Sequence, residues 1–180
     1  MHSATADLER LILALPREAQ PLVAGALPEA TRALSAEALK GWLEGVKLLL
    51  DAGSGQAPVV SYLRHVHGVV RAAGEALLPQ IVGVCLSVLQ RADARALDVF
   101  LDSLPQAARC LREAGALHGY LDLVDELAGL APRALTPMFE RLGQLLDQLS
   151  LDGLRRCLPG PSRRDLRGRR AAPAYRRGCR

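Results

Sequence analysis

The chain has 180 residues, which is enough for one compact domain and too few for a two-domain enzyme of ordinary size. Its composition is 49% hydrophobic but only 3% aromatic, so its core must consist mainly of Leu, Val and Ala. Residues 1–158 hold 15 Lys and Arg against 18 Asp and Glu, whereas residues 159–180 hold eight Arg and a single Asp, so the net charge of +4 does not indicate that the body binds nucleic acid.

Apolar residues recur at helical spacing from Leu8 to Leu149, and the alternation typical of strands is nearly absent. Breaks interrupt this pattern at Pro16, at Pro21, over residues 51–58 and 92–93, at Gly115, and over residues 131–132. The segments between them have the usual length of globular helices, and their connections are short. The sequence therefore predicts an all-α protein in which successive helices pack antiparallel.

The helical pattern repeats along the chain. Glu37-Ala38-Leu39 returns one period later as Glu75-Ala76-Leu77, and related triplets start at Gly115 and Asp152. Three aromatic residues, Tyr62, Phe100 and Phe139, follow one another at nearly the same interval. We therefore expect residues 1–158 to form about three antiparallel helix-pair repeats of about 38 residues, stacked as a short solenoid or bundle.

The spacing also predicts where the helices of each pair begin. First helices should begin near Glu37, Glu75 and Ala116, and second helices near Pro58, Asp93 and Arg133. Residues 22–34 resemble the second helix of an incomplete leading unit. Phe100 and Phe139 should then occupy equivalent buried positions between stacked pairs.

Residues 159–180 are rich in Arg, Gly and Pro and have no apolar period, which predicts a disordered tail. One interpretation is a basic arm that binds nucleic acid or an acidic partner. The other is a lost reading frame, because the body has two Lys, two Ile and no Asn, as a GC-rich gene would give. GC-rich DNA read out of frame tends to encode Arg, Gly, Pro and Ala, and the tail interrupts the fourth repeat in its first turn.

Neither export nor membrane insertion is indicated. No apolar run reaches the roughly 18 residues of a membrane span, and Asp7, Glu9 and Arg10 stand where a signal peptide would have a basic start and an apolar stretch. The four cysteines lie far apart, without the spacing of a zinc site, a redox pair or a disulfide framework. We expect a cytoplasmic protein with reduced thiols.

Several segments carry a resemblance to a known family. They are Leu39-x-x-Trp42-x-x-Gly45, Val60-Ser61-Tyr62-Leu63, and the stretches 99–104 and 149–156. Over about residues 8–156 the chain resembles the N-terminal helical region of the NorD/CbbO family, bacterial proteins that also have a C-terminal von Willebrand factor A domain.

The resemblance implies an adaptor role. Proteins of that family work with a MoxR-type AAA+ ATPase to activate or remodel a metalloenzyme such as nitric oxide reductase or Rubisco. This sequence has no Asp-x-Ser-x-Ser motif of the A domain, so it corresponds to a truncated adaptor half. The rival interpretations are a generic α-solenoid adaptor and a nucleic-acid-associated protein that uses its Arg-rich tail.

Two acidic clusters are the candidate partner-binding residues. Asp98 and Asp102 lie four residues apart and share a helical face, and Asp122, Asp125 and Glu126 share another. Either cluster could meet a basic partner or hold a cation, and solvated acidic faces would explain both as well. They are the best candidates for an ATPase-facing surface.

No residue is predicted to be catalytic, to ligate a metal or to bind a cofactor. His65 and His67 are two residues apart, point to different faces of a helix and are expected at the surface. The loop over residues 53–55 lacks the Gly-Lys-Ser/Thr of a phosphate cradle. Ser, His and Asp occur without the strand-turn-helix context of a hydrolase, so we expect a scaffold and not an enzyme.

Three other residues are assigned to the core. Cys85 lies on the apolar stripe of its helix and is expected to be an inert core thiol. Gly41 and Gly45 flank Trp42, which suggests a close approach of two helices. Trp42 is expected to anchor the core in preference to a partner.

Overall fold

The computed structural model describes residues 2–111 and 114–141, and every regular element in these residues is helical. The elements are α1 (His2–Leu13), α2 (Gln20–Ala33), α3 (Ala36–Asp51), α4 (Gln56–Ala73), the 3-10 turn η1 (Glu75–Leu77), α5 (Leu78–Arg91), α6 (Ala94–Cys110), α7 (Ala114–Leu130) and α8 (Pro132–Glu140). The predicted all-α class is confirmed, and the repeated helices begin within about three residues of the predicted starts.

Local sequence explains the helix boundaries. Ser35 caps α3 by accepting a hydrogen bond from the amide of Ala38, and Asp93 caps α6 by accepting one from the amide of Ala96. Gly74 ends α4 with a φ of +113°, a conformation that favours glycine. Pro21 lies in the first turn of α2, where a proline lacks no helical hydrogen bond, so the break lies before it and not at it.

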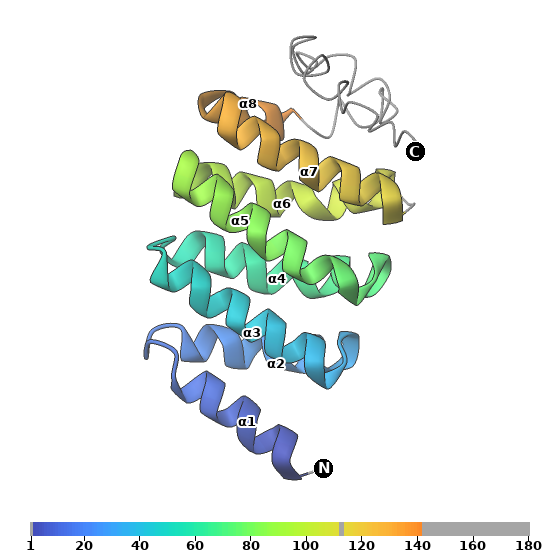
Figure 1. Ribbon diagram of the computed structural model, residues 1–180. Helices are drawn as coiled ribbons and strands as arrows, with labels where there is room; N and C mark the ends of the chain where they lie inside the picture. The colour runs from blue at the N-terminus through green and yellow to red at the C-terminus, as the bar shows by residue number, and fades with distance from the viewer. Residues whose placement is uncertain (1, 112–113, 142–180) are drawn as a thin grey trace, which may run out of the picture. The chain divides into compact units, whose positions relative to one another are not determined.

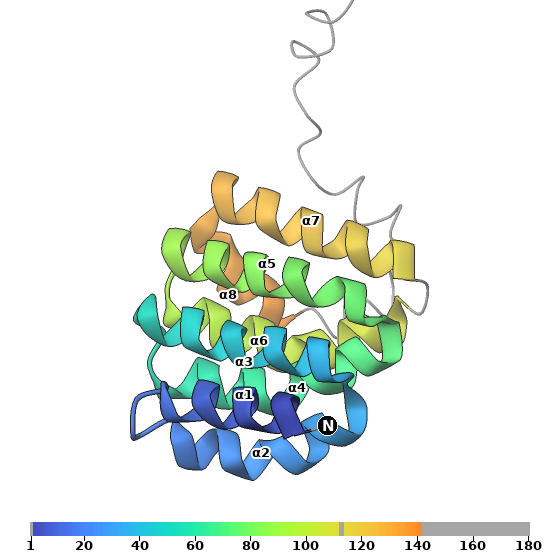
Figure 2. The same ribbon diagram turned by 60° about the horizontal axis from the view of Figure 1, so that its bottom comes forward.

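The helices form two layers (Figures 1 and 2). One layer holds α1, α3, α5 and α7, the other holds α2, α4, α6 and α8, and each helix packs against the next member of its own layer. The chain alternates between the layers, so α1 and α2, α3 and α4, α5 and α6, and α7 and α8 form successive antiparallel pairs. The leading unit predicted to be incomplete therefore has a first helix, because α1 packs against both α2 and α3.

Aromatic residues fill equivalent places in the core. Tyr62 of α4, Phe100 of α6 and Phe139 of α8 are all buried, and the ring centroids of Phe100 and Phe139 lie 5.2 Å apart. These three positions confirm the period predicted from the sequence. Each of the three residues belongs to the layer of α2, α4, α6 and α8. Burial of its apolar ring stabilises the packing of neighbouring pairs.

The predicted close approach occurs at Gly45. A Cβ atom there would lie 2.9 Å from Cζ of Tyr62 and 2.9 Å from Cγ2 of Val82, closer than real Cβ contacts. Trp42 is fully buried, its ring stacks with that of Tyr62, and its carbonyl accepts a hydrogen bond from the Tyr62 hydroxyl. Gly45 thus lets α3, α4 and α5 meet, and Trp42 belongs to the core as expected.

Two predictions extend beyond this part of the chain. The Arg-rich tail over residues 159–180 and the fourth repeat starting at Asp152 both lie outside the described residues. Within the described residues, no helix is both long enough and apolar enough to cross a membrane.

Candidate functional site

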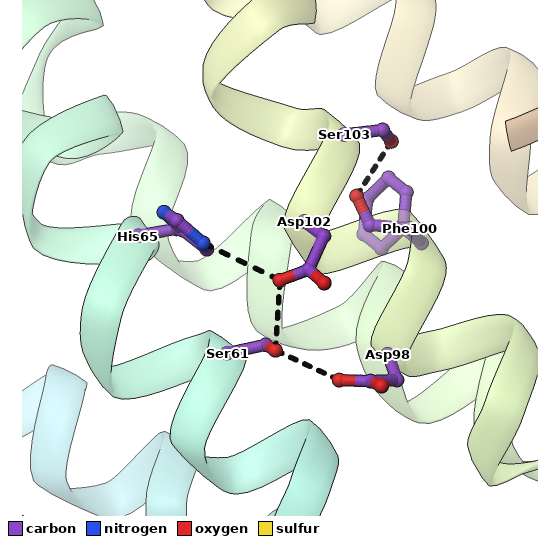
Figure 3. A network of polar contacts seen from close by, with 6 residues as sticks. All are labelled: Ser61, His65, Asp98, Phe100, Asp102 and Ser103. Carbon is purple, nitrogen blue, oxygen red and sulfur yellow. Dashed lines mark hydrogen bonds and ion pairs between the residues drawn. The ribbon is translucent and has the colours of Figure 1, made fainter. Parts of the chain in front are cut away.

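A network of polar side chains joins α4 to α6 (Figure 3). Ser61 and His65 lie four residues apart on α4, and Asp98 and Asp102 lie four residues apart on α6. Residues at this spacing share one face of a helix. Because α4 and α6 pack along their lengths, the two pairs meet across the interface.

Asp102 is at the centre of this network. The Ser61 hydroxyl lies 2.7 Å from Oδ1 of Asp98 and 2.9 Å from Oδ1 of Asp102. Nε2 of His65 lies 3.3 Å from the same Asp102 oxygen. A serine hydroxyl has one proton to donate, so Ser61 donates to the two carboxylates alternately or through one bifurcated hydrogen bond. In either case it links both carboxylates to α4.

The His65 ring makes this contact in its neutral form at pH 7. Burial lowers its pKa below the usual value of 6.5, the charge of Asp102 opposes that effect, and the charge of neighbouring Arg64 adds to it. A neutral imidazole can still donate a hydrogen bond from Nε2 to Asp102. The contact is therefore a hydrogen bond and not a salt bridge at neutral pH.

The network brings Ser, His and Asp together, but not in the order that nucleophilic catalysis needs. A serine nucleophile is activated by a base that accepts its proton, with a third group orienting the base. Here Asp102 lies between Ser61 and His65, and Ser61 is buried. The arrangement is suited to holding α4 and α6 in register.

The two predicted acidic clusters differ in their surroundings. Asp98 is half-buried, Asp102 is exposed, and both face α4. Asp122, Asp125 and Glu126 lie on α7 in the other layer, and all three are exposed. The structure therefore does not bring the clusters together, and whether either binds a partner stays a prediction.

The α7 cluster has weaker contacts than the α6 cluster. Asp122 accepts a hydrogen bond of 2.7 Å from the side-chain amide of Gln80 on α5, which also bonds to His118. Asp125 lies 3.9 Å from Arg91, and both of these side chains are about half exposed. Glu126 is exposed and forms no hydrogen bond or ion pair with the described residues.

The prediction of two surface histidines was wrong for His67, which is buried. Its Nδ1 donates a hydrogen bond of 3.0 Å to the Leu63 carbonyl, and its Nε2 lies 3.6 Å from Glu29 of α2. Its ring meets that of Trp42 edge to face. Packing of α2 against α4 covers this face of the helix, whereas His65, on the neighbouring face, is partly exposed.

Cys85 and residues 53–55 lie where the sequence predicts them, in the core and in a loop. Cys85 is buried, and burial raises the pKa of its thiol far above the usual range, which makes a thiolate unfavourable. Residues 53–55 form the loop between α3 and α4. No group of three or more His, Cys, Asp or Glu residues within the described ranges has the geometry to hold a metal ion.

Sequence reasoning missed the contacts that link one repeat to the next. The Ser35 amide and hydroxyl both donate to the Glu75 carboxylate, at 2.7 and 2.6 Å. Arg95 of α6 lies 3.1 Å from Glu140 of α8. A search for polar residues about one period apart would have found Ser35 with Glu75 and also Ser61 with Asp98, whereas Arg95 and Glu140 lie 45 residues apart.

Neither the models of known protein families, nor the curated proteins, nor the solved structures contain a match to this chain.

Proposed function

We propose that the protein is a non-catalytic interaction scaffold, the adaptor part of an activator that works with a MoxR-type AAA+ ATPase on a metalloenzyme. The observation that carries the scaffold role is the stacking itself. The first helices of the pairs lie side by side in one layer, and the second helices lie side by side in the other. Each pair therefore exposes the same helix faces and the same edges to solvent as its neighbours. Stacked helical repeats create extended surfaces of this kind, which suit protein partners.

The exposed residues of α7 are the best docking surface for such a partner. Asp125 and Glu126 offer carboxylates to solvent, and Asp122 is held only by an exposed amide. Leu130, on the same helix, is 66% exposed, and it lines a hollow together with Glu126 and Arg91. An apolar side chain beside several carboxylates fits a partner surface with a hydrophobic pocket and a basic rim.

Charge reversal on α7 tests this surface. The triple variant D122K/D125K/E126K of the full chain should capture less of a MoxR-type ATPase from the same organism. We expect a slower association rate and a weaker dependence on salt, because exposed charges mainly steer encounter. Binding is measured by surface-based kinetics with the ATPase in solution, at several salt concentrations.

A matched triple variant separates this site from a general change in charge. E9K/E18K/E37K changes the net charge equally at exposed positions on other segments, and it should bind the ATPase almost as well as the unmodified chain. Circular dichroism and melting temperature establish that both variants are folded. Equal capture by the two variants removes the α7 surface from consideration, and no capture by the unmodified chain removes the ATPase as the partner.

A further inference from the structure

Three exposed arginines occupy the last turns of successive helices in one layer. Arg32, Arg71 and Arg109 lie in the last turns of α2, α4 and α6. Each follows the one before it by one period of the repeat. All three are exposed, and none forms a hydrogen bond or an ion pair with another residue in the described part of the chain.

The fold arranges these arginines in a row. The helices α2, α4 and α6 run in the same direction, so their last turns lie along one edge of the stack, at the right of Figure 1. Each of these helices packs against the next, and packed helix axes lie about 8–10 Å apart. The last turns that hold the three arginines therefore lie about 10 Å apart, over a length of about 20 Å.

Arginines at helix ends also have a local role, since a cation offsets the negative end of the helix dipole. That role does not require the arginines to occupy equivalent positions in neighbouring helices. It also leaves the guanidinium nitrogens available for hydrogen bonds to a partner. The other layer provides a contrast, because Arg91 in the last turn of α5 faces Asp125 of α7. The arginines of the row form no such ion pair with a described residue.

We propose that the row Arg32, Arg71 and Arg109 binds an acidic polypeptide segment that lies extended along the edge of the stack. A chain in the extended polyproline II conformation has three residues per turn and advances about 3.1 Å per residue, so side chains three residues apart lie on one face at about the spacing of the row. A guanidinium can bind a carboxylate through two parallel hydrogen bonds. This inference rests on the proposed scaffold function and adds the chemistry of a second partner surface.

The same edge favours a peptide over a nucleic acid. Glu37 and Glu75 lie in the first turns of α3 and η1, next to the row, and their carboxylates would repel a continuous phosphate backbone. A peptide can place neutral residues at those points. Proteins that hold single strands also offer aromatic rings for base stacking, whereas every aromatic residue in the described ranges is buried.

The test compares two fluorescent peptides of identical composition with the full chain at low ionic strength. One peptide has Glu at every third position, and the other has the same Glu residues in one cluster. We expect tighter binding of the spaced peptide, measured by fluorescence anisotropy. Each of R32Q, R71Q and R109Q should weaken it by about two- to fivefold, and the triple variant should abolish the preference for spacing.

A matched triple variant, R17Q/R133Q/R141Q, removes three exposed arginines outside the row and should keep the preference. The Arg-rich residues 159–180 are present in all variants, so their attraction for both peptides cancels in the comparison. Arg109 and its two equivalents would have only the dipole role if their triple variant melted at a lower temperature and still preferred the spaced peptide. That result would overturn the proposal.

Other outcomes would also overturn it. Equal affinity of the unmodified chain for both peptides would show that the row does not distinguish evenly spaced from clustered Glu residues. Row-dependent binding that is tighter to oligodeoxythymidine or to phosphatidylserine vesicles than to the spaced peptide would assign the row to a nucleic acid or a membrane. If the unmodified chain binds the spaced peptide but does not capture the ATPase, only the partner proposed for α7 is contradicted. If it captures the ATPase but does not prefer the spaced peptide, only the proposal for the row is contradicted.

Discussion

Two interfaces between neighbouring pairs use the same kind of polar contact in different surroundings. Between α4 and α6, Ser61 is buried where it reaches the two carboxylates, and the rings of Tyr62 and Phe100 lie in the adjoining core. Between α5 and α7, Gln80 reaches Asp122 in an exposed position. The contacts span 37, 41 and 42 residues. Their different burial, and not their spacing, determines how much each contributes to stability.

Removal of the Phe100 ring should have the largest effect. Phe100→Ala is expected to lower the free energy of unfolding by about 3–5 kcal/mol, because the ring is fully buried and a cavity replaces it. Denaturant unfolding followed by circular dichroism measures the change. Leu130→Ala, at a position that is 66% exposed, is the control and should shift stability by about 0.5 kcal/mol or less. Similar effects of both variants would contradict the assignment of Phe100 to the core.

Loss of the Ser61 hydroxyl should have an intermediate effect. Ser61→Ala is expected to cost about 1–2 kcal/mol, since it leaves Asp98 and Asp102 without their shared donor. Ser87→Ala is a matched control on α5, because its buried hydroxyl has no hydrogen-bond partner among the described residues. That variant should be neutral or slightly stabilising. If Ser61→Ala also left the free energy of unfolding unchanged, the network between α4 and α6 would not contribute to stability.

Truncation of Gln80 should have the smallest effect. Gln80→Ala removes the exposed hydrogen bonds to Asp122 and His118, which compete with water. The expected change in unfolding free energy is within about 0.5 kcal/mol, measured under the same conditions as Ser61→Ala. A cost as large as that of Ser61→Ala would show that burial does not distinguish the two interfaces.

The sequence was sufficient to predict the helices and their repeat. The spacing of Tyr62, Phe100 and Phe139 was informative because one ring per repeat must fit the same core position. Helix starts were predictable from Ser35 and Asp93, whose side chains cap the first turn. The first helix, α1, was not assigned to a pair because the triplet that marks the other first helices has no counterpart in it.

The environment of the candidate site could not be predicted in the same way. Asp98 with Asp102 and Asp122 with Glu126 have the same spacing of four residues. Ser61 of α4 contacts both members of the first pair, whereas among the described residues only Asp122 of the second pair is hydrogen-bonded to the neighbouring helix. Which face a helix turns to its neighbour depends on its rotation, and helical periodicity leaves that angle uncertain by about one residue. His67 was misassigned for the same reason, since a small rotation decides whether α2 covers it.

The range of the contacts between repeats has a consequence for unfolding. Polar side-chain contacts between helices of different pairs join residues 34 to 45 positions apart within the described ranges, about one repeat. Each pair is thus held mainly by its immediate neighbours, as in a one-dimensional array. Loss of structure can start at an end and advance one pair at a time. Amide hydrogen exchange should accordingly be slowest in α4 and α6 and faster toward α1.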